Sequence, residues 1–514
     1  MSDGGVGVAG LALAIPGIID LCIKYGNFLK EKVQSYRHMN EIVRLYDFVA
    51  ALVAGEMSDL LLFFQSIHDK MPPGPREDVK QMFQVLRIKL ETVIAALPAD
   101  KPSKLEKLIF SFHVKKVIEK ACKELEEWQG RFLRRAVTFL FFGGLYTSDS
   151  TARIAKQNRV IARIKRIRDA FSNQELETTL SKLHVEDFAV TTTFRQLEDS
   201  SIYVVESGRE LVEYRRYDGG APPKEINALR IVVRDFAARL HAADPLVMGL
   251  LGCNGFSSEP LDHRFALRFL YPTGKTNPRT LQQLLIDRVN VSQGTKHSRS
   301  DRVELARKLA SAVLYLHSCN FVHKNIRPTN ILIFDAIAPN GADPKTITYP
   351  YVIGDPYLVG FDDVRRADAR SSMIRVEDWK RNIYLHPDRH RMASGDEFTM
   401  LHDIYSLGVV LLEIALWVSV SDLGAHGIGQ NLWQSLEKGK ERLLDPESLR
   451  QRYCNIAKSL IPRHMGNKYR DVVISCLEGL RDEEEGGLLK DQDGVIVGSA
   501  YISQIMSRLE EITM

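Results

Sequence analysis

The residues best suited to chemistry lie in the segment VHKNIRPTNILIF, 322–334, of this 514-residue chain. Phosphoryl transfer needs positioned groups, charge neutralisation by magnesium and a base that orients the nucleophile. Asn330 can bind a cation, whereas Asn325 is neutral and cannot accept a proton. In the later segment YLVGFDDVR, 357–365, the first carboxylate comes only at Asp362. The two segments therefore offer amide, hydroxyl and basic side chains, and no carboxylate before Asp362.

Both segments resemble motifs of protein kinases, the catalytic loop H-R-D-L-x-x-x-N and the metal-binding D-F-G. The resemblance puts Asn325 at the catalytic aspartate and Gly360 at the metal-binding aspartate, so both carboxylates are missing. The remaining matched positions keep or replace the kinase residues as follows: His323 and Asn330 are kept, Lys324 replaces the arginine, Arg327 replaces the lysine, and Phe361 with Asp362 complete G-F-D.

Further motifs extend the resemblance over residues 185–514. YLHPDRH resembles the A-P-E segment, with Asp388 at the glutamate, and HDIYSLGVVLLEIALW resembles a buried helix that begins near an aspartate, here Asp403. The glycine-rich phosphate loop G-x-G-x-x-G is absent before the candidate strands. In VEYRR the best match to V-A-I-K puts Arg215 at the lysine, which makes Arg215 the candidate residue of a degenerate nucleotide pocket.

These departures predict a pseudokinase, with no intact catalytic residue, no metal site and no cofactor. Weak nucleotide binding without metal stays open. An alternative is an atypical active kinase that transfers phosphate from ATP to Ser or Thr and binds metal through Asp362 or Asp363.

The order of elements predicts a multidomain chain, an all-α helical bundle followed by an α+β two-lobed kinase-like fold. Apolar residues recur at helical spacing from about 11 to 170, with proline-rich breaks at 71–75 and 98–102. Strand-like segments follow near 191–194, 201–205, 209–217 and 264–272, with a helix at 225–242. The expected domains are a bundle at 1–150, a basic linker at 151–182, and a kinase-like domain at 183–514, divided at about 272 into its two lobes.

Residues 4–19 form an apolar, glycine-containing start of sixteen residues without a charge. It lacks the basic start of a signal peptide, and Pro16 and Asp20 argue against a transmembrane helix. The segment is interpreted as a buried first helix or as a helix that also inserts into membrane. Its candidate membrane residues are Val6, Val8, Leu11, Leu13, Ile15, Ile18 and Ile19.

A basic amphipathic helix is predicted at 152–171, with an apolar stripe and seven Lys or Arg. Residues 101–168 carry 17 basic and 6 acidic side chains, +11, so with an overall charge of +4 the rest of the chain is −7. Such a helix can dock on anionic lipid or pack against its own bundle. Its candidate lipid-facing residues are Arg153, Lys156, Arg159, Arg163, Lys165 and Arg166.

The six cysteines are scattered singly, which favours a reducing intracellular compartment.

The charge-poor start and the helical run after it resemble the fungal HeLo domains of the prion-inhibition and propagation class. Joined to a pseudokinase, they resemble the mixed-lineage kinase domain-like family of necroptosis. The resemblance implies a programmed cell-death effector of the heterokaryon-incompatibility type, whose kinase-like domain controls a membrane-permeabilising bundle. The alternative outside both enzyme and effector classes is a non-enzymatic signalling scaffold.

The expected partners are anionic membrane lipids, an upstream activating kinase or receptor protein, and further copies of the chain on activation. No nucleic acid is expected to bind. Ser371 and Ser372 lie among arginines that could pair with an added phosphate, so they are the candidate regulatory sites. The chain is expected in the cytoplasm and, once activated, at the plasma membrane.

Overall fold

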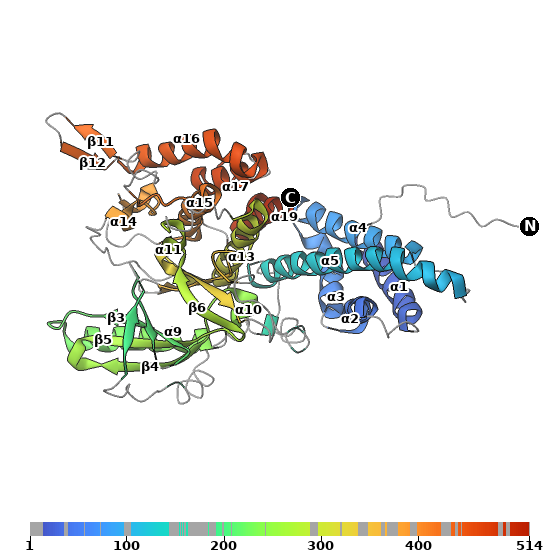
Figure 1. Cartoon of the computed structure of the whole chain (residues 1–514), viewed down its shortest axis with the longest axis horizontal. Coiled ribbons are helices and arrows are strands. Elements are labelled where there is room, and N and C mark those ends of the chain that lie inside the picture. The colour runs from blue at the N-terminus through green and yellow to red at the C-terminus, as the bar shows by residue number, and fades with distance from the viewer. Residues whose placement is uncertain are drawn as a thin grey trace, which may run out of the picture. The chain divides into compact units, whose positions relative to one another are not determined.

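The computed structural model divides into two compact units, residues 1–162 and 163–514, each described by itself below (Figure 1). The residues it describes are 14–34, 40–55, 57–71, 73–96, 104–142, 154, 156, 158, 161–162, 183, 192–197, 200–206, 208–241, 243–287, 297–318, 321–337, 348–360, 365–366, 379–390, 398–422, 433–436, 440–443, 445–481, 487–489 and 494–512.

The first unit is helical, as the spacing of apolar residues predicts. Its helices are α1 Ile15–Gln34, α2 Asn40–Ala54, α3 Ser58–Ile67, the short η1 His68–Lys70, α4 Pro73–Ala96 and α5 Lys104–Phe142. Helix α5 is continuous over 39 residues, and Gly130 lies inside it. The sequence pattern predicts two separate helices here, 104–128 and 131–142, on either side of Gly130. That prediction is wrong, because the packing of α5 against α4 and α2 outweighs the weak helix propensity of a single glycine.

Helix α1 is part of the core of this unit. Ile15, Ile18 and Ile19 are each at most 3% exposed, and α1 packs against α2 and α4. A Cβ on Gly26 would lie 2.8 Å from the Val53 side chain, so α1 and α2 approach closely at that position. Three of the seven candidate membrane residues are therefore buried in this state, and Val6, Val8, Leu11 and Leu13 lie outside the described residues.

Aromatic rings join α3, α4 and α5. The rings of Phe83, Trp128 and Phe132 lie with centroids 5.0 to 6.2 Å apart, and Phe64 is 5.5 Å from Phe132. The indole N–H of Trp128 donates to the carbonyl oxygen of Met82 over 2.8 Å, which satisfies its one polar group. This cluster fixes the three helices side by side.

In the part of the chain that the structure describes, no helix is both long and apolar enough to cross a membrane.

The second unit begins with a five-stranded antiparallel sheet of order β1-β2-β3-β5-β4. Helix α9 packs against β4 and β5 (Figure 1). The bounds are β1 Phe194–Gln196, β2 Ile202–Val205, β3 Glu210–Arg216, α9 Pro223–His241, α10 Pro245–Met248, β4 Cys253–Glu259, η2 Pro260–Asp262 and β5 Arg264–Leu270. Val205, Val212, Tyr214 and Ala266 form a core on one face of the sheet, which leaves alternate β3 residues on the other.

A second sheet, of order β6-β8-β9, carries the segments that resemble kinase motifs. Its neighbourhood comprises β6 Lys275–Thr280, α11 Leu281–Leu285, α13 Arg299–Ser318, β7 Phe321–Val322, η3 Pro328–Asn330, β8 Ile331–Ala336, β9 Asp355–Leu358 and β10 Arg365–Arg366. Strand β10 pairs with β7. The pairing of β8 with β9 brings the segment 323–330 beside residues 359–360.

Helices form the rest of the second unit around the buried α15. The elements are α14 Trp379–Asn382, η6 Pro387–His390, α15 Met400–Leu416, β11 Trp433–Leu436, β12 Lys440–Leu443, α16 Pro446–Met465, α17 Asn467–Glu478, α18 Gly494–Tyr501, the π-helical η8 Ile502–Met506 and α19 Ser507–Glu510. Buried tyrosines bond across the interior: Tyr469 donates to Leu411 O over 3.1 Å and Tyr501 to Ala310 O over 2.9 Å. The first bond joins α17 to α15 and the second joins α18 to α13, and Asp403 lies in the first turn of α15.

Candidate functional site

The loop before β8 is held by the carboxylate of Asp403, which is fully buried. One carboxylate oxygen accepts the backbone N–H of His323 over 2.6 Å, and the other accepts that of Lys324 over 2.8 Å. His317 lies 3.1 Å from the first oxygen. Lys324 has a φ of +65°, which is unfavourable for a residue with a Cβ. The two charge-assisted bonds therefore hold a strained loop conformation.

The side chain of His323 connects this loop to the strand after it. Its Nε2 lies 2.9 Å from the carbonyl oxygen of Val359, and the residue is fully buried. The backbone N–H of Val359 in turn donates to Asn330 O over 3.0 Å. These bonds fix residues 359–360 against the loop. The structure brings His323, Asn325, Asn330 and Gly360 close together.

Asn330 occupies the space next to Gly360. Its Nδ2 donates to the carbonyl oxygen of Asn325 over 2.9 Å, and the side chain is only 1% exposed. A Cβ on Gly360 would lie 2.3 Å from the Cγ of Asn330, and Gly360 has a φ of +78°. Any side chain at 360 would therefore collide with the amide and strain the backbone. The D-F-G motif of kinases has a metal-binding carboxylate at this position. Here that carboxylate is missing, and the Asn330 amide fills the space beside the glycine.

Glu213 on β3 provides the side chain that reaches Gly360. Its Oε2 accepts the Gly360 N–H over 3.1 Å, and Glu213 is 2% exposed. Arg215 lies two positions farther along the same face of the strand and is partly buried. The β3 residue at the site is thus an acid, and Arg215, which the sequence match favoured, lies beyond it. The sequence signal for Glu213 was an acidic residue enclosed by apolar neighbours in a strand.

A small pocket of about 80 Å³ opens beside the loop. This volume is well below the roughly 300–1,000 Å³ of ligand pockets. Its lining includes Gln282, Arg327, Thr329, Lys380, Tyr384 and Ser421. The pocket suits small polar solutes or water.

Glu413 of α15 is buried close behind this pocket. Its Oε1 accepts from the Tyr384 hydroxyl over 2.8 Å and from the Val420 N–H over 2.8 Å. Burial raises the pKa of Glu413 to about 8, although these bonds and one from Ser419 oppose the rise. The network joins the end of α15 to the segment that resembles A-P-E. Its chemistry is structural, because the carboxyl group is enclosed.

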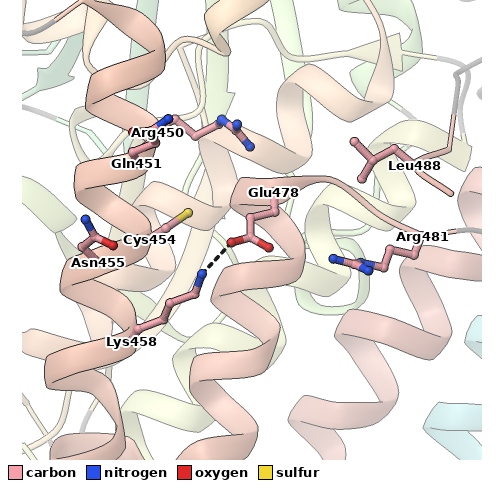
Figure 2. Close-up of a pocket in the computed structure, with 8 residues that line it drawn as sticks. All are labelled: Arg450, Gln451, Cys454, Asn455, Lys458, Glu478, Arg481 and Leu488. Atoms are coloured by element: carbon pink, nitrogen blue, oxygen red, sulfur yellow. Dashed lines mark hydrogen bonds and ion pairs between the residues drawn. The ribbon is translucent and has the colours of Figure 1, made fainter. Parts of the chain in front are cut away.

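A larger pocket of about 490 Å³ lies between α16, α17 and the residues Arg481 and Leu488. Figure 2 shows Lys458 paired with Glu478, whose N–O distance is 2.8 Å, with Arg450 and Arg481 directed toward the same region. The eight lining residues are Arg450, Gln451, Cys454, Asn455, Lys458, Glu478, Arg481 and Leu488. Burial raises the pKa of the Cys454 thiol to about 11, so the thiol is not an activated nucleophile.

The other predicted site residues are only partly described. Lys156 is exposed, in agreement with a solvated basic face, while Ile154 and Ile161 of the same segment are buried. The predicted positions that lie outside the described residues are Arg153, Arg159, Arg163, Lys165, Arg166, Phe361, Asp362, Ser371 and Ser372.

Comparison with known proteins identifies a kinase-like domain in this unit. Residues 276–459 match the family of protein tyrosine and serine/threonine kinases. A probable LRR receptor-like serine/threonine-protein kinase of Arabidopsis thaliana is 30% identical over 158 residues, which is 30% of this chain and 16% of the relative. The chain therefore matches only about a sixth of that relative's length. A helical N-terminal region followed by a kinase-like domain of sheet and helices is established, and the HeLo identity of the first unit stays a prediction.

Proposed function

We propose that the kinase-like domain is a pseudokinase that acts as a switch for the helical N-terminal unit, which engages membranes when released. One observation carries the first half of this proposal. The Asn330 amide fills the space beside Gly360, and Glu213 is bonded to the Gly360 N–H. The place where a kinase holds metal and phosphate is closed by these two side chains.

Charge also argues against nucleotide binding at this place. Kinases use a β3 lysine to pair with the nucleotide phosphates. Glu213 brings a buried carboxylate toward Gly360, and its negative charge repels phosphate oxygens in a poorly screened interior. Asn325 adds no base to replace the missing aspartate. Among the described residues at the matched positions, magnesium lacks the D-F-G carboxylate, and the substrate hydroxyl lacks the base that phosphoryl transfer needs.

The proposed membrane role rests on the first unit and on the resemblance to HeLo domains. Ile15, Ile18 and Ile19 are buried in the bundle, as expected of a latent state that hides its apolar helix. Release would expose this face, and anionic lipid would attract it together with the basic residues of the predicted helix 152–171, of which Lys156 is already exposed. Phosphorylation of Ser371 or Ser372 by an upstream kinase, assembly of several copies and movement from cytoplasm to plasma membrane complete the proposed cell-death function.

Nucleotide binding and phosphate incorporation by the full chain test the pseudokinase half. We expect no thermal shift with Mg-ATP and no incorporated phosphate in the wild type, with Asn330→Ala as the comparison. A Mg-ATP-dependent shift with phosphate incorporation that Asn330→Ala abolishes would instead support an active kinase. That alternative is favoured by one observation, the intact Asp403 scaffold of the loop.

Leakage of anionic vesicles and cell viability test the membrane half. Deleting residues 1–13 leaves α1 and its buried isoleucines in place. Deletion of residues 1–13 is therefore a more specific test than deletion of residues 1–23, because the longer deletion would also remove Ile15, Ile18 and Ile19 from the core of the first unit. We expect the induced full chain to reach the plasma membrane and reduce viability, and the deletion to weaken both effects. Stable protein partners with unchanged viability would favour a signalling scaffold.

A further inference from the structure

Two histidines and an aspartate lie together where the segment 383–390 meets the start of α15. Within the described residues, His386, Asp388 and His402 form the group whose ligand atoms all lie within 4.8 Å of one another. His386 precedes η6, Asp388 is inside it, and His402 is in the first turn of α15. The group is separate from Asn330 and Gly360 in sequence and uses other side chains.

We propose that His386, Asp388 and His402 form a binding site for a transition-metal ion of the zinc class, which ties the segment 386–390 to the start of α15. Two imidazole nitrogens and one carboxylate oxygen are a donor set that Zn²⁺ and its neighbours in the first transition row accept. Water would complete the coordination. This inference does not depend on the proposed switch function.

The distances allow this coordination after a small movement. Nδ1 of His386 and the nearer carboxylate oxygen of Asp388 are 3.5 Å apart. Two ligand atoms at about 2.0–2.1 Å from a tetrahedral ion lie roughly 3.3 Å apart. The widest pair, at up to 4.8 Å, must close further. Asp388 can move toward the two rings, because its side chain is 64% exposed and can rotate.

The two rings are already held near each other by aromatic packing. The His386 and His402 ring centroids are 5.1 Å apart, with the planes at 62°. Phe398 packs on His402 at 4.9 Å and Tyr405 on His386 at 5.1 Å. Ligands that are fixed before the metal arrives lose little conformational freedom when it binds. This packing favours binding at the two nitrogens.

Metal ligation requires neutral imidazole rings, and the burial of the two histidines favours the neutral form. Burial lowers the pKa of His402 to about 3, with nearby His386 and Arg389 adding to the effect. Burial also lowers the pKa of His386. Three cations and three carboxylates surround the rings: Lys324, Arg389, Arg450, Asp388, Asp403 and Glu447. Their charges offset one another, so the surroundings do not repel a divalent ion strongly.

The hydrogen bonds of His402 define which nitrogen would bind. Its Nδ1 accepts the backbone N–H of Thr399 over 2.9 Å, so the ring proton is on Nε2. If the metal takes Nε2, the proton moves to Nδ1, and Thr399 Oγ1 at 3.2 Å can accept it. The ring keeps one proton throughout. Metal binding would thus replace the bond from the Thr399 N–H to His402 with a bond from the His402 ring to Thr399 Oγ1. Thr399 would then orient the ligand ring through this second bond.

Metal titration of the full chain tests this site. The chain is stripped with a chelator, carries no histidine tag, and is titrated with Zn²⁺ by calorimetry and with Co²⁺ by visible absorption. We expect one ion per chain, a rise in Tm with Zn²⁺, and a Co²⁺ spectrum of a four-coordinate site. Zn²⁺ stabilises the folded chain because it binds that state.

Variants at the exposed Asp388 and the partly buried His386 assign the site without changing the buried His402. Asp388→Asn and His386→Gln are each expected to weaken Zn²⁺ binding by at least about tenfold. His464→Gln, which alters an exposed histidine at the end of α16, is the matched control and should bind as the wild type. Absence of stoichiometric uptake by the folded wild type would overturn the proposal. The proposal would also be overturned if Asp388→Asn and His386→Gln bound Zn²⁺ as tightly as the wild type. It would be overturned as well if His464→Gln lost as much Zn²⁺ affinity as those two variants.

Discussion

The amide N–H of Gly360 donates to the carboxylate of Glu213 over 3.1 Å. This bond joins β3 to the segment after β9, at the position that the sequence resemblance assigns to the metal-binding aspartate of kinases. On its other side, Gly360 contacts the Asn330 amide so closely that no Cβ fits. The two contacts together make the site a packed interior position. Substitutions here are therefore expected to affect stability before they affect any reaction.

Restoring the aspartate of D-F-G should not restore catalysis. Gly360→Asp places a side chain into a contact of 2.3 Å and on a backbone with a φ of +78°. We expect a loss of unfolding free energy of about 1–2 kcal/mol for the backbone conformation and of about 1–3 kcal/mol more for overpacking. Chemical denaturation and phosphate incorporation, measured on the same sample, check this prediction.

A second glycine separates the two causes. Gly274 has a φ of +74° but no atom within 4 Å of its missing Cβ. Gly274→Ala should therefore show only the backbone cost, and Gly360→Ala should cost more. Adding Asn330→Ala to Gly360→Ala should recover part of the difference. Equal losses for the two single glycine variants would mean that the Asn330 contact is not restrictive.

The Glu213 carboxylate should matter as a hydrogen-bond acceptor. Glu213→Ala leaves the buried Gly360 N–H without its partner, with an expected loss of about 1–3 kcal/mol. Glu213→Gln retains an acceptor oxygen and should lose less. Arg216→Ala changes an exposed residue of the same strand and should be nearly neutral. Urea denaturation distinguishes these outcomes, and an equally large loss in Arg216→Ala would show that β3 itself is fragile.

Asp403 should be the residue on which the loop most depends. Asp403→Asn replaces one of two carboxylate oxygens with an N–H donor, which then faces the N–H of His323 or Lys324. We expect a loss of about 1.5–3 kcal/mol, the contribution of a hydrogen bond to a charged group. Asp301→Asn makes the same Asp-to-Asn replacement at an exposed position in α13 and serves as the control. Similar unfolding midpoints for both variants would contradict the assigned role of Asp403.

Glu413 should make stability fall as pH rises toward 8. The folded-state pKa is raised to about 8 from an ordinary 4.5, so the folded chain holds a proton that the unfolded chain has released. Unfolding free energy therefore decreases with pH across this window, by at most about 1.4 kcal/mol per pH unit. Burial lowers the pKa of His402 and His386, which gives the opposite slope below about pH 6.5. The interval from pH 7 to 8 isolates Glu413.

The comparison with Glu413→Gln tests that assignment. Gln keeps an acceptor for the Tyr384 hydroxyl and the Val420 N–H but does not titrate. The difference in unfolding free energy between wild type and variant should shrink as pH rises from 7 to 8, because only the wild type loses stability. Parallel curves over that interval would contradict a buried, proton-binding Glu413.

Helices and strands whose residues follow one periodicity were predicted from the sequence. Elements that form only through contacts between residues distant in sequence were not predicted. The strand near 201–205 and the helix near 225–242 were predicted close to β2 and α9, and the helical N-terminal region is confirmed. Strand β4, CNGFSSE, was missed because its glycine and serines have low β propensity, while pairing with β5 forms it.

The site was predictable as a set of motif positions and unpredictable as a geometry. The order of His323, Asn325 and Asn330 is evident in the sequence. The closure of the site depends on segments thirty residues apart that approach so closely that a Cβ on Gly360 would lie 2.3 Å from Asn330 Cγ. The motif match selected Arg215 because an arginine resembles lysine in charge. The alternation of β3 places Glu213 at the Gly360 contact instead, and only the strand register shows this.

The burial of α1 makes a prediction that connects stability with membrane binding. Ile19 is fully buried, so Ile19→Ala should cost about 2–5 kcal/mol. If the bundle is a latent membrane effector, this loss frees α1 more often, and binding of the full chain to vesicles containing anionic lipid should rise. Phe28→Ala removes a 47% exposed side chain from the same helix and should change neither quantity much. Vesicle co-sedimentation at fixed salt, beside thermal unfolding of each variant, measures both. Destabilisation by Ile19→Ala without increased vesicle binding would count against the membrane role, because exposure of the apolar face would then have no lipid-directed effect.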